Sequence, residues 1–239
     1  MNMHLYPANS RGGADHGWLK AKHTFSFASW YNPEQMHFGA LRVLNDDWIA
    51  GGEGFGTHPH DNMEIITIPH SGALEHRDSM GNHGIIQAGD VQVMSAGTGI
   101  QHSEFNHNSD EACTLFQIWI FPKIRGVKPR YDQKSFDTNA MHNQLLNIVA
   151  PMESNSDALK IHQNAYLSMG TFDAGQRIPY TLQHPGNGIF IQNISGEIAC
   201  NQQTLKQRDA MGVWDTDNVE LMVNQAAKVL IIEVPMALQ

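Results

Sequence analysis

Short apolar runs separated by turn residues dominate the chain, and segments with helical periodicity are rare. In the first half the apolar runs are GALRVL at 39–44, MEIITI at 63–68, GII at 84–86, VQVM at 91–94 and LFQIWIF at 115–121. Residues that favour turns stand between them, namely Asn45-Asp46-Asp47, Ser71-Gly72, Gly81-Asn82 and Ala88-Gly89-Asp90. Apolar runs of this length and spacing predict the strands of a β-barrel or β-sandwich.

The second half repeats this rhythm, with apolar runs at 188–194, 197–200, 212–214, 219–223 and 228–234. Between the halves, residues 122–137 are charged and contain two prolines, which is typical of a linker. We therefore predict an all-β protein of two barrels in tandem, an N-terminal domain of residues 1–130 and a C-terminal domain of residues 131–239. A short helix is expected near residues 138–149.

Composition narrows the classes of partner. The 239 residues carry a formal net charge of −9 with scattered Lys and Arg, so the sequence offers no basic patch for direct nucleic-acid binding. An anionic surface argues against membrane adhesion, and no run of about 18 apolar residues predicts a membrane span. The N-terminus lacks a signal-peptide pattern, and Cys113 and Cys200 form neither a CxxC motif nor a disulfide framework. We expect a reduced cytoplasmic protein, and by default a monomer.

Histidine gives the first indication of chemistry, because 11 of the 14 histidines lie in the first 107 residues. His58 and His60 stand in one Gly-rich segment, and His102 and Glu104 stand in a second one. Residues i and i+2 of a strand point to the same face, about 6.6 Å apart, so each pair can converge on one metal ion. If the two strands oppose each other across a barrel, the four side chains surround one point.

Two neighbouring residues bear on this predicted site. Pro59 lies between the first two histidines and donates no backbone hydrogen bond, which is tolerated at a sheet edge or a bulge. Glu64 is a rival carboxylate with the parity of His60, but it lies about 13 Å further along a straight strand. We prefer Glu104, which needs no distortion of its strand. A His-x-His pair alone is more often a polar strand face, whereas the two pairs together predict a metal site.

These segments closely resemble the pirin family of bicupins, especially its bacterial branch of quercetin 2,3-dioxygenase-like proteins. The matching stretches cover most of residues 11–135 and are HGWLKAKHTFSFASWYNP (16–33), ALRVLNDD (40–47), GFGTHPHDNMEIIT (54–67), HRDSMGNHG (76–84), GDVQVMSAGTGIQHSE (89–104) and QIWIFP (117–122). The resemblance implies two cupin barrels, with metal in the N-terminal one only, and ligand roles for His58, His60, His102 and Glu104. The C-terminal half resembles the family only in its strand rhythm.

Three neutral imidazoles and one carboxylate form a mixed donor set that suits Fe(II), Mn(II), Co(II), Ni(II), Cu(II) or Zn(II). Four protein ligands leave an octahedral ion two open positions for a substrate oxygen and dioxygen, so Fe(II) is our first choice by analogy with non-haem iron oxygenases. The resemblance implies that quercetin or a related flavonol chelates the metal through its 3-hydroxyl. Glu104 would take the hydroxyl proton as ligand and general base, and oxygen insertion would open the central ring and release carbon monoxide.

Two other functions stay open, because a fold alone does not determine the chemistry that it hosts. A redox-responsive regulatory protein of the pirin type would bind a partner with an affinity that changes when the metal is oxidised. A metal-dependent isomerase or hydrolase on the same barrel would turn over without oxygen.

Other polar residues carry weaker expectations. Histidines around the expected hairpin turns are predicted to be exposed to solvent: His70, His76 and His83. His23, which precedes an alternating strand predicted at 24–27, is expected to make a structural hydrogen bond; the alternative is that it supports a metal ligand or lines the substrate site. Asn62 shares the parity of the two strand histidines and is a candidate to hydrogen-bond a ligand.

Overall fold

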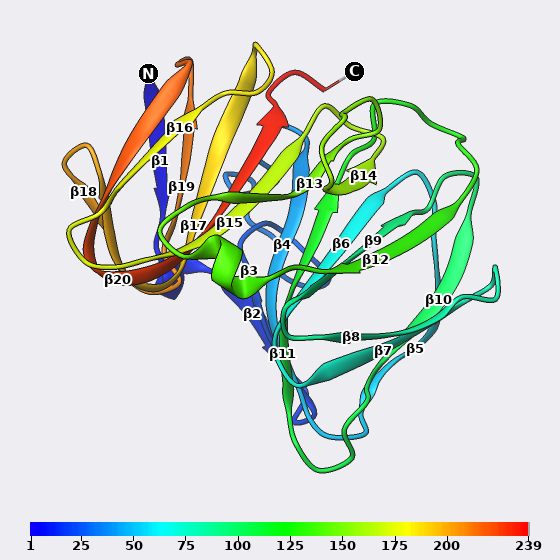
Figure 1. Cartoon of the computed structure of the whole chain (residues 1–239). Helices are drawn as coiled ribbons and strands as arrows, with labels where there is room; N and C mark the ends of the chain where they lie inside the picture. The colour runs from blue at the N-terminus through cyan, green and yellow to red at the C-terminus, as the bar shows by residue number, and fades with distance from the viewer. Residues whose placement is uncertain (239) are drawn as a thin grey trace.

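The computed structural model describes residues 1–238, and β-strands make up most of them (Figure 1). One group of strands follows the N-terminal half of the chain: β2 (Gly12–Asp15), β3 (Leu19–His23), β4 (Leu41–Ile49), β5 (Gly54–His60), β6 (Glu64–Ser71), β7 (Ala73–Asp78), β8 (His83–Gln87), β9 (Asp90–Ser95), β10 (Ile100–Asn106), β11 (Cys113–Ile120) and β12 (Arg130–Ser135). The other group contains β1 (Asn2–Tyr6), β13 (Leu146–Pro151), β14 (Leu159–Ile161), β15 (Tyr166–Phe172), β16 (Arg177–Thr181), β17 (Asn187–Cys200), β18 (Gln203–Leu205), β19 (Ala210–Trp214) and β20 (Asn218–Pro235). Two short 3-10 helices, η1 (Ala8–Ser10) and η2 (Thr138–Met141), complete the described elements.

The strands form two barrels that lie side by side in Figure 1. The first barrel combines a seven-stranded sheet, in the order β12-β9-β6-β11-β4-β3-β2, with a four-stranded sheet in the order β5-β10-β7-β8. The second barrel is a nine-stranded sheet in the order β1-β19-β17-β20-β15-β13-β14, with β16 against β20 and β18 against β17. The prediction of two all-β barrels is therefore confirmed. Within residues 1–238 no helix is long and apolar enough to cross a membrane.

Each apolar run predicted as a strand overlaps a strand of the structure. In the second half, neighbouring runs merge, so that residues 188–200 lie in β17 and residues 219–234 lie in β20. Gly196, at a φ of 76°, and several register shifts bend β17 without ending it. The helix expected near residues 138–149 is reduced to the single turn η2, after which β13 begins.

The turn predicted at residues 45–47 is wrong, because these residues lie inside β4. β4 pairs with β3 on one side and β11 on the other, and this double pairing outweighs the turn preference of Asn and Asp. Oδ2 of Asp46 forms salt bridges with Arg11 Nη1, at 3.2 Å, and with Arg208 Nε, at 3.3 Å. Within this segment, Asp47 lines the cavity of the first barrel.

The strand predicted at residues 24–27 is also wrong. β3 ends at His23, and Phe27 forms only an isolated bridge with Trp30. The Ser26 hydroxyl donates to the Asn32 carbonyl at 2.9 Å and accepts from the Asn32 amide at 2.8 Å, which closes this segment into a loop. Such side-chain bonds compete with strand pairing and are not visible in the alternation of residues.

The two barrels exchange strands at the ends of the N-terminal half. β1, drawn in blue, pairs with β19 and so lies among the orange and red strands of the second barrel (Figure 1). The segment predicted as a linker contains β12, which pairs with β9 of the first barrel. A division at residue 130 stays a prediction; by strand pairing, residues 2–6 go with the second barrel and residues 130–135 with the first.

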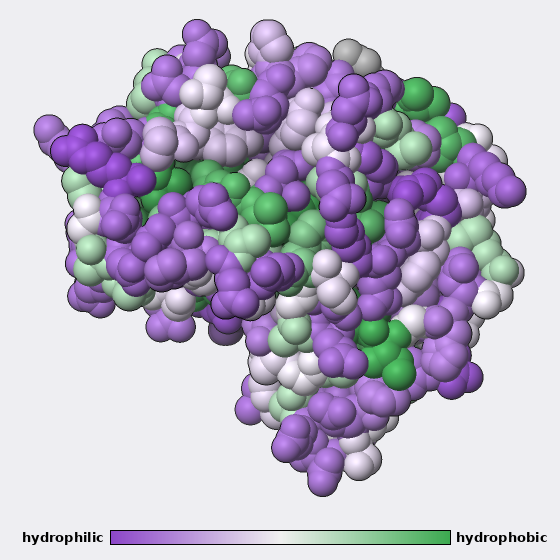
Figure 2. Space-filling model, viewed as in Figure 1, coloured by the Kyte–Doolittle hydropathy of each residue, from purple (hydrophilic) through white to green (hydrophobic). Residues whose placement is uncertain are grey.

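The largest hydrophobic core lies between the barrels and draws residues from both. Phe190 of β17 packs against Phe25 and Phe38 of the N-terminal half, with ring centroids 5.6 Å apart in each case. On the face shown in Figure 2, hydrophilic residues dominate and hydrophobic ones form small separate patches. The apolar runs of the sequence are thus buried in the barrel interiors and in the contact between the barrels.

Candidate metal centre

The predicted metal-binding residues come from two adjacent antiparallel strands. His102 of β10 lies opposite His58 of β5, and Ile100 lies opposite His60. The two strands therefore lie side by side and do not oppose each other across the barrel; local periodicity does not reveal which strands are neighbours. Pro59 lies on β5, at the edge of its four-stranded sheet, which is the position where a missing amide hydrogen is tolerated.

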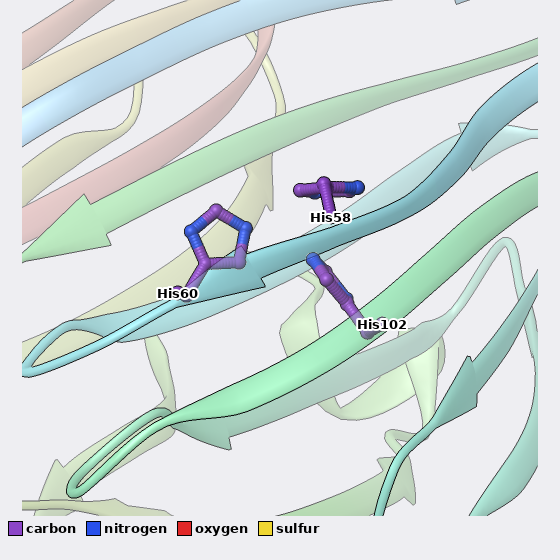
Figure 3. A group of neighbouring side chains, drawn as sticks. All are labelled: His58, His60 and His102. Atoms are coloured by element: carbon purple, nitrogen blue, oxygen red, sulfur yellow. The ribbon is translucent and has the colours of Figure 1, made fainter.

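Three histidine rings gather on one side of these strands (Figure 3). His58, His60 and His102 can each offer one nitrogen, and the three nitrogens lie within 4.8 Å of one another. The ring centroids are 4.4 to 4.9 Å apart. His58 Nδ1 lies 2.8 Å from the Gly56 carbonyl, which assigns the proton to Nδ1 and leaves Nε2 free as a ligand.

The rings have the electronic character that a metal requires. Burial and the neighbouring His102 and His58 rings lower the pKa of His60 to about 4. Burial and the neighbouring His58 and His76 rings lower the pKa of His102 to about 3. Both rings are therefore neutral near pH 7, with lone pairs to donate. His102 Nε2 is buried without a hydrogen-bond partner in the described part of the chain, which is the environment of an atom whose partner is an ion.

Glu104 lies close to this group but is held separately. A register shift in β10 after His102 places Glu104 opposite Phe55. The Glu104 carboxylate is buried and accepts a hydrogen bond from Gln117 Nε2 at 2.9 Å, and the Thr67 hydroxyl donates to Gln117 Oε1 at 3.1 Å. One oxygen of the Glu104 carboxylate lies within 4.8 Å of a ring nitrogen of His102 and of His76. Glu104 lines the same cavity as His58 and His60.

That cavity has a volume of about 470 Å³ and opens beside the histidines. Its walls combine aromatic rings with a few polar groups: Trp18, Phe27, Phe55 and Trp119, with Asn45, Asp47, His58, His60, Glu104 and Gln117. Flat apolar walls with a small number of convergent polar groups suit a flat aromatic ligand of moderate size.

Comparison with known proteins identifies the family. The family model described as Pirin matches residues 5–120, and the model described as Quercetinase C-terminal cupin domain matches residues 148–234. The quercetin 2,3-dioxygenase of Escherichia coli K12 is 41% identical over 233 residues, covering 98% of this chain and 99% of that protein. The chain belongs to the pirin family.

Solved structures agree with this assignment. YhhW from Escherichia coli superposes on this pirin with a TM-score of 0.94 at 39% identity, over 100% of both chains. A second structure of YhhW, described as a bacterial pirin in complex with nickel(II), gives a TM-score of 0.92 over 99% of this chain and 100% of that one. A quercetin 2,3-dioxygenase from Acinetobacter baumannii shares the fold, with a TM-score of 0.75 at 19% identity over 98% of this pirin and 79% of that chain.

The rival carboxylate of this pirin, Glu64, does not reach the histidines. It is buried on β6, where it accepts a hydrogen bond of 2.7 Å from the Ser95 hydroxyl, and it is in neither group of candidate metal-binding side chains found among residues 1–238. Asn62 does not face the cavity either. It has a φ of 44°, in a turn, and its Oδ1 accepts a hydrogen bond from the Gly126 amide at 2.7 Å. The expectation that Asn62 contacts a ligand is wrong, because strand parity ends where β5 ends.

Two of the three histidines predicted to be exposed are not. His76 is fully buried in contact with His102, and both ring nitrogens of His70 are buried against Phe116 without a partner in residues 1–238. His83 is exposed, as expected. His23 is buried beside Phe27, but its Nδ1 lacks the predicted hydrogen bond among the described residues. The alternation in ALEHRD (73–78) was the signal for His76, since it places Leu74, His76 and Asp78 on one face.

Asn45, Asp47 and Gln117 line the cavity with polar side chains that the sequence did not indicate, and Asp47 is the acidic one among them. Its Oδ1 is buried and accepts no hydrogen bond from residues 1–238. Burial, together with the negative charges of Asp46 and Glu104, raises the pKa of Asp47 to about 8. Asp47 therefore carries a proton at pH 7 and can donate a hydrogen bond into the cavity, whereas Glu104 is an acceptor for Gln117.

Replacing Asp47 with Asn should stabilise the metal-free protein, and increasingly so at higher pH. The pKa of Asp47 in the folded protein lies above its unfolded value of 3.8. The buried carboxyl therefore costs no stability below pH 3.8, and it lowers the free energy of unfolding progressively as the pH rises towards 8. We expect the D47N variant to gain at least about 1 kcal/mol in free energy of unfolding at pH 8, and less at pH 5. Urea denaturation at both pH values measures this gain. The exposed Asp217→Asn control should show no such trend, and an equal gain at both pH values would contradict a protonated Asp47.

Proposed function

We propose that this pirin is a metal-dependent dioxygenase that cleaves quercetin or a related flavonol with O2. The observation that carries the proposal is the convergence of three histidine nitrogens within 4.8 Å, at the wall of an aromatic cavity. The full-length similarity to the quercetin 2,3-dioxygenase of Escherichia coli supports the same reaction. The partners of the site are then a small aromatic substrate and dioxygen.

One divalent transition metal would be held by His58, His60, His102 and Glu104. Three imidazoles and one carboxylate suit such an ion, and the unpartnered His102 Nε2 supports its position. The nickel(II) complex of YhhW supports a divalent ion in this family of sites. We propose Fe(II) as the working metal because the donor set leaves open positions for substrate and O2; Mn(II), Co(II), Ni(II), Cu(II) and Zn(II) fit the same donors.

The bound ion and the surrounding side chains have separate roles in the proposed reaction. The bound ion would supply Lewis-acid polarisation of the substrate hydroxyl and a path for electron density towards O2. Glu104 accepts the proton of the flavonol 3-hydroxyl. Gln117 holds the Glu104 carboxylate in place for that transfer, and Thr67 orients the Gln117 amide. Trp119 and Phe27 present an edge-to-face aromatic wall, with ring centroids 5.3 Å apart, against which a flat ring system can pack. Flavonol and O2 give the ring-opened ester acid and carbon monoxide, and the proton taken by Glu104 returns to the product.

Oxygen consumption tests the proposal. Metal-stripped protein reconstituted with each candidate ion should consume O2 in proportion to quercetin loss with at least one ion. His58→Ala should abolish uptake, because removing one of the clustered nitrogens disrupts the ion's donor set. Stoichiometric metal binding with no uptake for any ion would exclude the dioxygenase and favour the regulatory function.

We further propose that chemistry is confined to the N-terminal domain, residues 1–130, and that the C-terminal domain, residues 131–239, holds no metal. Both groups of candidate metal-binding side chains found among residues 1–238 lie between His58 and Glu104. A monomeric state, a cytoplasmic location and the absence of direct nucleic-acid binding stay predictions from composition.

A further inference from the structure

A buried pair of side chains lies directly behind His102, on the side away from His58 and His60. β7 pairs with β10, so that Asp78 lies opposite His102 and His76 lies opposite Glu104. The side chains of His76 and Asp78 are both 0% exposed. His76 Nδ1 is 3.4 Å from His102 Nδ1, and His76 Nε2 is 3.3 Å from Asp78 Oδ2.

The turn after β7 fixes Asp78 as an acceptor. Its Oδ1 accepts from the backbone amides of Met80 and Asn82, at 2.9 and 3.0 Å, and its Oδ2 accepts from Asn82 Nδ2 at 2.9 Å. A carboxylate that receives these donors offers His76 only an acceptor. His76 Nε2 must therefore donate to Asp78.

We propose that Asp78 and His76 form a hydrogen-bonded relay that fixes the tautomer and orientation of His102 for metal binding. In a neutral His76 that donates through Nε2, Nδ1 is an acceptor, so His102 must donate through its own Nδ1. The proton of His102 then resides on Nδ1, and its Nε2 carries the free lone pair. That Nε2 is the buried atom without a partner in residues 1–238. The relay rests on the proposed metal site and not on the reaction performed there.

Tyr131 closes the relay from outside. Its ring lies over His76, with centroids 4.7 Å apart and planes 30° apart. Tyr131 belongs to β12, and its hydroxyl donates to Gln133 at 2.9 Å. The strand that was predicted as linker thus shields the relay, which strengthens its hydrogen bonds by excluding competing water.

An alternative role for His76 is that of a direct ligand, since His76, His102 and Glu104 also place one atom each within 4.8 Å of the others. The two rings, however, face each other through their Nδ1 atoms. An ion between those atoms would be bound on the opposite side of His102 from the Nε2 lone pair. The two roles therefore predict different protonated nitrogens on His102.

Nitrogen-15 NMR of the metal-free wild-type protein tests the relay without any substitution. The relay requires a proton on Nδ1 of His102 and on Nε2 of His76. A proton on Nε2 of His102 in the metal-free protein would overturn the relay. The relay would also be overturned if nickel(II) removed the Nδ1 proton of His102 and bound to His76.

Nickel(II) titration of a His76→Phe variant provides the second test. Phe keeps a ring against Tyr131 but removes both nitrogens, so we expect affinity for nickel(II) to fall about 10- to 100-fold. The His102 tautomer of the variant should shift towards Nε2–H, which a purely structural role would not produce. The exposed His83→Phe control should leave both readouts unchanged. An affinity within about twofold of wild type, in a folded His76→Phe protein, would contradict the relay. Neither measurement uses substrate or O2, so failure here is distinct from failure of the dioxygenase proposal.

Discussion

Replacing Glu104 with Gln is expected to slow quercetin turnover by about 100-fold or more, the usual contribution of a positioned base. Gln fills the same space and can still present an oxygen, so part of the metal should remain bound. It cannot take the 3-hydroxyl proton, because an amide is not a base at neutral pH. Gln117, which donates to Glu104 at 2.9 Å, can still meet an oxygen at this position. Turnover at saturating metal, together with metal content by elemental analysis, measures the effect.

Glu64→Gln is the matched control. Glu64 is as buried as Glu104. Its carboxylate accepts a hydrogen bond from the Ser95 hydroxyl, which the amide oxygen of Gln can also accept. The variant should retain activity close to wild type. Unchanged turnover in the E104Q protein at full metal occupancy would remove Glu104 from the role of base.

Replacing Phe190 with Ala is expected to lower the free energy of unfolding by about 3–5 kcal/mol, the usual cost of deleting a fully buried aromatic ring. Phe190 is 0% exposed and contacts Tyr6, Phe25 and Phe38 at the junction of the barrels. Because this core is shared, wild type should unfold in one transition as measured by urea denaturation.

The exposed Tyr31→Ala variant should change stability by no more than about 0.5 kcal/mol. A loss below about 1 kcal/mol for F190A, or two separate transitions in wild type, would show that the barrels are stabilised independently.

Most strands of the fold can be predicted from the sequence, because the barrel strands in this chain are continuous apolar runs. The run at 63–68 overlaps β6, and the run at 115–121 overlaps β11, because both strands are paired on two sides within the barrel. Residues 45–47 were misassigned, since two flanking strands override the turn preference of Asn and Asp. The exchange of β1 and β12 between barrels was not readable either, because it depends on contacts between residues far apart in sequence.

The candidate ligands were readable from the i, i+2 spacing of His58 with His60 and of His102 with Glu104. The order of the strands could not be predicted in this way, and the two pairs lie on neighbouring strands, not across the barrel from each other. The sequence does not identify His76, because its position near a turn predicts exposure to solvent, whereas its side chain is 0% exposed. Its burial is decided by the cover of β12, which local sequence does not reveal.

The most direct test of the central claim is single-turnover labelling with ¹⁸O2 of metal-reconstituted protein and quercetin. A dioxygenase that uses the His58, His60, His102 and Glu104 site should place both labelled atoms in the ring-opened product and release carbon monoxide. The same preparation should be inactive under argon. Product formation under argon, or product without label in ¹⁸O2, would contradict the account and indicate an isomerase or hydrolase on this barrel.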